Sequence, residues 1–308
     1  MGKWYHVEAC PLDDREEQSH ADLHRCKSPP VFILSVTLLE LGFFVYYSAL
    51  AAARSSSSDL SPVTSDLPSA TSLTSVTSDR TSVTSDLTPD LTSVVRLGSM
   101  GTVPLDSALV YRPDRSWELW RLVTYMVLHT SWWHLTFNLL VQLAVGVPLE
   151  LGHGTVRVAA IYLAGVLAGS LGTSVCDAGR QVYLVGASGG VYALLTAHIA
   201  NVLLNYNHME LGVQRLLAVL LIAVCDAALA VYHRYWLVLS SVEPAVSYAA
   251  HLAGGVAGLS LGLAILRSHS PKHRQPLIRY LGLGVLLACA LFAILFNVLS
   301  VNRGHQYL

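Results

Sequence analysis

The amino-acid sequence predicts an all-α membrane protein that crosses the bilayer seven times. Hydrophobic residues make up 53% of the 308-residue chain, charged residues make up 13%, and the mean hydropathy is +0.50. These values lie outside the usual range of a soluble globular domain. The apolar residues are also gathered into runs of about 20 residues, the length that a helix needs to cross the hydrocarbon core.

Seven apolar runs have this length or approach it, and the second is the shortest. They are residues 31–53, 135–151, 156–175, 187–204, 214–232, 247–267 and 278–300. The loop between the last two runs, together with the ends of the runs that border it, holds basic residues and no acidic one: Arg267, Lys272, Arg274 and Arg279. Such loops stay in the cytoplasm. The N-terminus is therefore predicted to be cytoplasmic, and the second, fourth and sixth helices to begin on the luminal or extracellular side.

The segments between and around the helices differ in composition. Residues 1–30 are polar and mixed in charge, which predicts a cytoplasmic segment without a cleavable signal peptide. Residues 54–102 are rich in Ser and Thr and repeat the motif V-T-S-D, which predicts a disordered luminal insertion. Residues 103–267 form a core together with the first helix, and they begin with a tryptophan-containing loop that we expect in the membrane interface. Residues 268–308 supply a cytoplasmic loop, the last helix and a tail.

Charge and cysteine content exclude several classes of function. The net charge of -1 points to no nucleic-acid partner. The five cysteines lack C-x-x-C spacing and predict neither a disulfide framework nor a zinc site: Cys10, Cys26, Cys176, Cys225 and Cys289. We expect no metal and no cofactor.

Polar residues that lie inside apolar runs are the informative ones, because they are costly in a bilayer. His134 and Asn138 lie four residues apart at the start of the second helix, on one face. Ser188 lies in G-A-S-G-G at the start of the fourth helix, with Tyr192 one turn later. His251 begins the sixth helix in A-H-L-A-G-G. The predicted topology puts all these helix starts on the same side of the membrane.

A hydroxyl, two imidazoles and a carboxamide at one depth provide the groups that acyl transfer requires. Ser188 is the expected nucleophile, and His251 is the expected base that accepts its proton. His134 and Asn138 suit an oxyanion hole. Asp226 is predicted to lie near mid-membrane, too deep to orient His251, so the sequence favours a dyad over a triad.

Each of these features has a simpler explanation when it is taken alone. Gly254 and Gly258 have the four-residue spacing of close helix packing. A single serine flanked by glycines is more often a packing residue than a nucleophile, and a single intramembrane histidine is as often structural as a proton relay. The motif G-x-S-x-G also occurs in soluble α/β hydrolases, but the alternating strands and helices of that fold are absent from this sequence. The catalytic interpretation depends on the combination.

The motifs G-A-S-G, A-H-x-x-G-G and H-x-x-x-N, with the upstream pair Trp120 and Arg121, resemble those of the rhomboid proteases. The resemblance extends from about residue 31 to 299, apart from the Ser/Thr-rich tract. It implies a core of six helices with one additional C-terminal helix, and it implies a catalytic dyad. The position of the seventh helix resembles the secretory-pathway branch of eukaryotic rhomboids.

The resemblance also implies roles for individual residues. The oxyanion hole would combine His134 and Asn138 with the backbone amide of Ser188. The ring of Tyr192 would stack on His251. Further residues would support the site or hold the interface loop: Gly186, Gly189, Gly254, Gly258, Trp120 and Arg121. Inactive relatives lose the serine or place a proline before it, whereas this chain has Ala187 before Ser188.

The expected activity is cleavage of single-pass membrane proteins near the luminal face, with release of their ectodomains. Growth-factor precursors are substrates suggested by family analogy. The expected location is a Golgi, endosomal or plasma membrane. A non-catalytic membrane chaperone or degradation adaptor is the main alternative. A proton-coupled transporter is a weaker one, because the sequence has no internal repeat.

Overall fold

The computed structural model is built almost entirely of helices. It describes residues 29–58, 99–100, 102–178, 182–206, 212–232, 247–268 and 275–304. The long helices are α2 (Val31–Ser58), α5 (Trp132–Val141), α7 (Thr155–Cys176), α8 (Ser188–Asn205), α9 (Gly212–Tyr232), α10 (Tyr248–Ile265) and α11 (Gln275–Gly304). The short elements are strands β1 (Ser99–Met100) and β2 (Val103–Pro104), a 3-10 turn η2 (Pro113–Arg115), α4 (Arg121–Thr124), a 3-10 turn η3 (Tyr125–Val127), a π-helical turn η4 (Gln142–Gly146) and α6 (Val147–His153).

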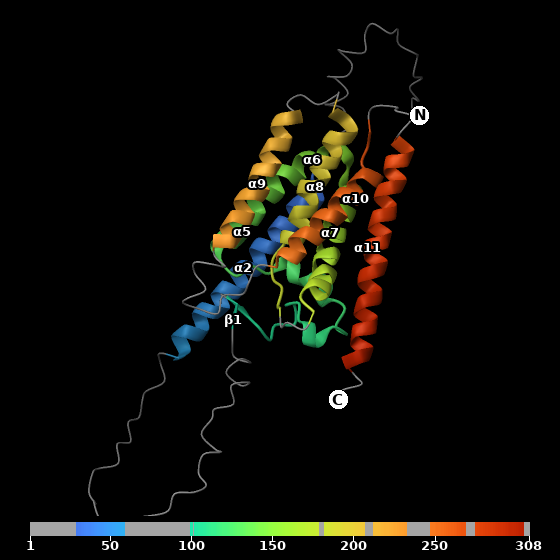
Figure 1. Ribbon diagram of the computed structural model, residues 1–308. Helices are drawn as coiled ribbons and strands as arrows, with labels where there is room; N and C mark the ends of the chain where they lie inside the picture. The colour runs from blue at the N-terminus through green and yellow to red at the C-terminus, as the bar shows by residue number, and fades with distance from the viewer. Residues whose placement is uncertain are drawn as a thin grey trace, which may run out of the picture.

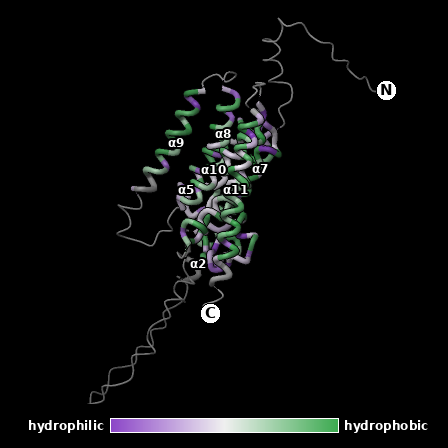
Figure 2. Tube along the Cα trace, turned by 45° about the vertical axis from the view of Figure 1, so that its right-hand side comes forward, coloured by the Kyte–Doolittle hydropathy of each residue, from purple (hydrophilic) through white to green (hydrophobic). Residues whose placement is uncertain are grey.

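A helix occupies every apolar run that the sequence singled out, and Figure 2 shows that hydrophobic residues predominate along the helices. Five helical stretches of the described chain are long and apolar enough to cross a membrane: Val31–Arg54, Trp132–His153, Thr155–Cys176, Tyr248–Ile265 and Pro276–Ser300. The chain is therefore an all-α polytopic membrane protein, and seven crossings remain a prediction. The first helix continues to Ser58, past its predicted end at residue 53. Most of the Ser/Thr-rich tract and of the N-terminal segment lies outside the described residues.

The centre of the bundle is formed by α7, α8 and α10, which pack against one another (Figure 1). α2, α9 and α11 lie around them, with α9 and α11 at opposite edges of the view. α8 packs most closely, and 12 of its residues are buried. This central position of α8 is the structural reason that its first residue can meet side chains from several neighbouring helices.

Glycines allow the backbones of α8 and α10 to touch. A Cβ at Gly254 would collide with the carbonyl oxygen of Gly189, and a Cβ at Gly258 would collide with the backbone of Ala193. Small residues at this spacing are the usual means of close helix approach in membranes. The contact lies one turn beyond His251 and beside Ser188, so it brings these two predicted residues toward each other.

A polar network joins α2 to the middle of the bundle. The carboxylate of Glu40 accepts hydrogen bonds from Tyr162 Oη at 2.8 Å and Gln142 Nε2 at 3.3 Å, and all three residues are fully buried. Gln142 begins the π-helical turn that joins α5 to α6. Pro148 follows that turn and lacks an N–H, so it cannot continue the regular helical bonding to the carbonyl four residues earlier. The wide turn thereby directs Gln142 toward α2.

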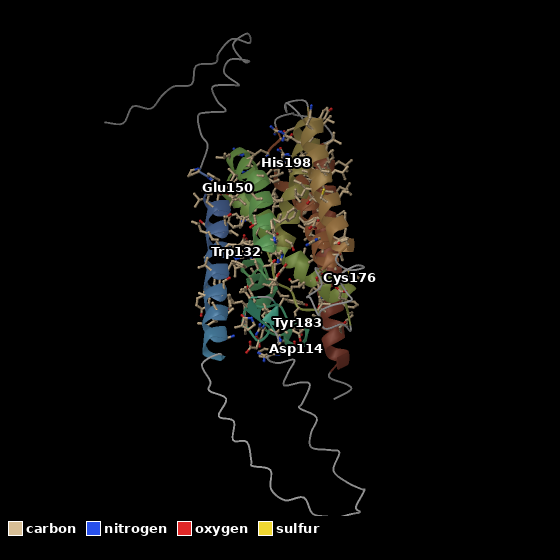
Figure 3. The ribbon with its side chains drawn as sticks, turned by 90° about the vertical axis from the view of Figure 1, so that its left-hand side faces the viewer. Asp114, Trp132, Glu150, Cys176, Tyr183 and His198 are labelled. Carbon is tan, nitrogen blue, oxygen red and sulfur yellow. The ribbon has the colours of Figure 1, made fainter. Side chains whose placement is uncertain are left out.

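A second carboxylate caps the beginning of α2. The two oxygens of Glu150, from α6, accept the backbone N–H groups of Phe32 and Ile33, both at 2.9 Å. The first N–H groups of a helix have no partner within it and attract negative charge. Figure 3 shows Glu150 near one end of the bundle, and Asp114 and Tyr183 near the other.

The segment between β2 and α5 is held by Arg121. This side chain is 2% exposed, pairs with Glu118 at 2.5 Å, and donates to the carbonyls of Ser107 and Val110, both at 2.7 Å. Trp120 is half-exposed and donates its indole N–H to the carbonyl of Ala108. The predicted structural role of this pair is consistent with these contacts, and the Glu118 partner was not foreseen. The loop then reaches the site, because Tyr111 pairs with Leu184, just before the motif that contains Ser188.

Substitution of Gly258 tests the contact between α8 and α10. We expect Gly258→Ala to destabilise the folded protein by about 1–3 kcal/mol, because the added methyl group meets backbone that cannot move aside. The measurement is thermal unfolding in detergent. Gly284→Ala is the matched control, since no atom lies within 4 Å of the place that its added methyl group would take. Equal unfolding temperatures for the two variants would contradict the prediction.

Replacement of Arg121 by lysine tests the loop anchor. A single ammonium group cannot reproduce the planar arrangement that joins Glu118 to two carbonyls. We expect Arg121→Lys to lower stability by about 1–3 kcal/mol and to increase proteolysis of the loop. Arg115→Lys is the control, because Arg115 is about half-exposed and its guanidinium lies 3.5 Å from Glu118. The prediction is wrong if both variants resist unfolding and protease as the unchanged protein does.

Candidate active site

The beginning of α8 is shaped by Gly186. Its φ of 118° lies in a region that residues with a side chain rarely adopt. Its N–H donates to the carbonyl of Tyr125 at 3.0 Å, which fixes the turn. Ala187 occupies the N-cap position and makes no side-chain cap, so Ser188 opens the helix with its backbone N–H at an uncapped positive helix end.

The beginning of α5 brings His134 to the same turn. Ser131 is its N-cap and accepts the His134 N–H at 3.2 Å. The imidazole then lies against Gly186, where a Cβ would be 2.6 Å from ring Cε1 and 2.8 Å from Nε2. Its other nitrogen, Nδ1, lies 3.2 Å from the hydroxyl of Thr130. Gly186 is therefore required both by its backbone conformation and by the imidazole beside it.

A further histidine, His129, lies behind this ring and was not foreseen. It is fully buried, its ring centroid lies 5.1 Å from that of His134, and neither of its nitrogens has a hydrogen-bond partner within the described chain. Burial and the neighbouring His134 lower the pKa of His129 well below its ordinary value. A neutral ring therefore supports His134.

The beginning of α10 positions His251. Ser247 is the N-cap, accepts the Ala250 N–H at 3.2 Å, and shares a hydrogen bond of 2.8 Å with Thr173 on α7. This cap fixes the first turn of α10 against α7. His251 follows in that turn and is 7% exposed.

Side chains from two other helices hold the His251 ring. Tyr192 from α8 stacks on it with ring centroids 4.4 Å apart and an interplanar angle of 14°, the arrangement that the resemblance implied. Asp226 from α9 places Oδ2 3.3 Å from His251 Nδ1, and the same oxygen accepts the Tyr192 hydroxyl at 2.5 Å. The other ring nitrogen, Nε2, is buried and has no hydrogen-bond partner among the residues described.

The position of Asp226 corrects the sequence analysis, which placed this residue too deep to orient His251. The contact of 3.3 Å shows that the two side chains lie at one level. Asp226 precedes the end of α9 at Tyr232 by six residues, about 9 Å along the axis. His251 lies three residues after the start of α10 and Tyr192 four residues after the start of α8, so Asp226 needs to lie only a short distance inside the end of α9 to reach both.

Other predicted residues lie around this group. Asn138 is buried, and its amide donates to the carbonyl of His134 at 2.8 Å, so its second N–H remains for another acceptor. Gly189 faces Tyr125 and α7, where a Cβ would lie 3.2 Å from the tyrosine hydroxyl. Gly254 and Gly258 form the contact between α8 and α10. The structure thus places the predicted catalytic, oxyanion-hole and supporting residues in or beside one region.

A cavity of about 420 Å³ opens beside His251, between α8, α9 and α10. Tyr192, Asp226 and Tyr248 line it together with His251, and the rest of its wall includes Ala223 and Leu259. The cavity is large enough for several peptide atoms. Ser188, His134 and Asn138 are not among its lining residues, so the cavity borders the site on the side of His251 and Asp226.

Comparison with known proteins identifies related sequences. The sequence model of the Rhomboid domain matches residues 116–268. Rhomboid-related protein 2 of Mus musculus is 33% identical over 289 residues, which cover 93% of this chain and 81% of the relative. Rhomboid-related protein 3 of Homo sapiens is 32% identical over 91% of this chain and 59% of its own length. Inactive rhomboid-related protein 2 of Caenorhabditis elegans is 29% identical over 82% of this chain.

The matched domain contains every candidate site residue described above, from His134 to His251. The relatives include one that is named inactive, so membership does not by itself establish catalysis. Sequence, fold and comparisons agree on one point. The chain belongs to the rhomboid family.

Proposed function

We propose that this chain is an intramembrane serine endopeptidase in which Ser188 is the nucleophile and His251 is the general base. The observation that carries the proposal is the set of contacts that the His251 ring makes. Its Nδ1 faces a carboxylate and its face is covered by Tyr192, while Nε2 has no partner in the described chain. A general base needs a free nitrogen on a ring that is held in place.

In the proposed first step, the Ser188 hydroxyl gives its proton to His251 Nε2 as the oxygen attacks the substrate carbonyl carbon. The imidazolium then gives that proton to the leaving amine, and the C–N bond breaks. Water then attacks the carbonyl carbon of the resulting ester while His251 accepts its proton. The proton passes to the Ser188 oxygen as the acid product leaves, which regenerates the hydroxyl. Hydrogen bonds of a catalytic pair are often long in the absence of substrate, and they shorten in the complex.

The negative oxygen of the intermediate would lie at the uncapped beginning of α8. The Ser188 N–H is available there, and the positive end of the helix dipole favours an anion. A His134 tautomer with its proton on Nε2 would donate from the side of Gly186. The second N–H of Asn138 would complete the set. Donors fixed in place before the reaction are a large source of rate enhancement.

The proposed substrates are single-pass membrane proteins, with growth-factor precursors as one class. A helix in the bilayer must unwind to present an extended peptide to Ser188, so helix-weakening residues near the scissile bond favour cleavage. The basic loop after α10 supports an orientation in which α5, α8 and α10 begin on the luminal or extracellular side. Ectodomains would then be released there, from a Golgi, endosomal or plasma membrane.

A non-catalytic role in binding membrane helices is the second candidate, because one relative is named inactive. The presence of Ser188 after Ala187, together with His251, supports the catalytic proposal over this one. Binding without cleavage of any single-pass substrate by the unchanged protein would favour the second candidate.

The decisive test is cleavage of a single-pass model substrate by the protein in liposomes. We expect Ser188→Ala and His251→Ala each to reduce cleavage by about 10³-fold or more, because each removes one half of the dyad. Fluorophosphonate labelling should be lost in Ser188→Ala. Either variant cleaving at the unchanged rate would exclude the proposed dyad.

Control variants distinguish chemistry from general damage to the bundle. His198→Ala removes a buried histidine of α8, about 15 Å along the helix from Ser188. Ser260→Ala removes a buried serine of α10. Both controls should cleave substrate at close to the unchanged rate.

The oxyanion-hole proposal is tested at Asn138. We expect Asn138→Ala to lower kcat by about 10²–10³-fold with little change in KM, because the donor acts on the charge that develops in the transition state. Asn297→Ala is the matched control, since the Asn297 amide also donates to the carbonyl four residues earlier, at 2.8 Å. Equal kcat values for the two variants would contradict the assignment.

A further inference from the structure

Asp226 is the acidic residue of α9, and the partners that the structure gives it belong to the candidate site. Its Oδ2 lies 3.3 Å from His251 Nδ1 on α10 and accepts the Tyr192 hydroxyl of α8 at 2.5 Å. One carboxylate oxygen therefore joins three helices at the ring of the proposed base.

Apart from Tyr192, Thr196, Tyr248 and His251, the other residues that line the cavity beside Asp226 are apolar. Ala223 and Ala227 flank it along the cavity wall, and outward residues of α9 such as Leu220 and Val224 are exposed on the surface of the bundle. A carboxylate in such a helix is costly unless it has partners or a function. The packing of α9 alone would be satisfied by an apolar residue at this position.

The geometry matches the requirement of a histidine base. An imidazole that accepts a proton at Nε2 must carry its own proton on Nδ1, and an acceptor beside Nδ1 selects that tautomer. A carboxylate also stabilises the imidazolium that forms when the proton is accepted. The carboxylate of Asp226 lies at Nδ1, and Nε2 has no partner within the described part of the chain.

We propose that Asp226 is a positioning residue that orients His251 and stabilises its protonated form. The proposal rests on the proposed function, in which His251 is the base. It changes the expected dyad into an arrangement of three residues from three helices. Asp226 contacts neither substrate nor Ser188 and acts through the His251 ring. The Tyr192 hydroxyl holds the carboxylate in place from the other side.

The test compares Asp226→Asn, Asp226→Glu and Tyr192→Phe in full-length protein reconstituted in liposomes. Asparagine keeps the size of the side chain but can present an N–H to Nδ1, which would leave Nε2 protonated and unable to accept. We expect kcat of Asp226→Asn to fall by about 10²-fold or more with KM unchanged. The rate of phosphonate labelling of Ser188 should fall in parallel. Asp226→Glu should recover part of the loss, because it restores the charge.

Tyr192→Phe separates the two partners of the carboxylate. It removes the hydroxyl bond to Asp226 and keeps the ring that stacks on His251, so its kcat should fall much less than that of Asp226→Asn. Unfolding temperatures in detergent show whether each variant is folded. A structural role alone would lower the unfolding temperature and the active fraction, and it would leave kcat per phosphonate-titrated site unchanged.

The outcomes distinguish this proposal from the proposed function. Cleavage by Ser188→Ala or His251→Ala would overturn both. Loss of cleavage in those two variants, with kcat of Asp226→Asn close to the unchanged value, would overturn the role of Asp226 alone.

Discussion

The contact between the backbones of α8 and α10 sets the distance between the helix that begins with Ser188 and the helix that carries His251. The two helices approach this closely because Gly254 and Gly258 of α10 lack side chains where they meet the backbone of Gly189 and Ala193 in α8. Tyr192 can stack on His251 at 4.4 Å only when the helix axes are close. The packing of small residues, which alone would be an ordinary feature of a membrane bundle, is therefore what permits the proposed chemistry.

The three helices that begin at the site differ in their N-caps. Ser131 and Ser247 cap α5 and α10 with their hydroxyls, whereas Ala187 leaves the start of α8 without a side-chain cap. A side-chain acceptor at position 187 would bond the N–H of the second or third residue of α8, beside the Ser188 N–H that the proposed oxyanion needs. Side-chain caps thus hold the first turns of α5 and α10, which carry His134 and His251, whereas no side chain at position 187 competes with the proposed oxyanion at the start of α8.

The sequence was sufficient for features that depend on local pattern. Hydrophobic length located the helices, and costly polar residues in their first turns pointed to Ser188 and His251. Side-chain contacts between distant elements were not accessible in this way. Glu118 resembles any loop acid until its pairing with Arg121 is seen, and Asp226 was misplaced because residue counts along a helix do not reveal the depth of the neighbouring helices. His129 gave no signal apart from its nearness to His134 in the sequence.

The buried carboxyl of Glu40 has a consequence for the synthesis of the protein. Glu40 lies within the first apolar helix, where a charged residue at the helix centre disfavours insertion by about 2.5–3.5 kcal/mol. Its partner Tyr162 follows 122 residues later in the chain, so the nascent first helix must enter the membrane before that hydroxyl has been translated. Until then the carboxyl needs protection by water, a proton or the insertion machinery. A chain truncated before Gln142 would lack both hydrogen-bond donors to Glu40 and would leave this carboxyl unpaired in the first helix.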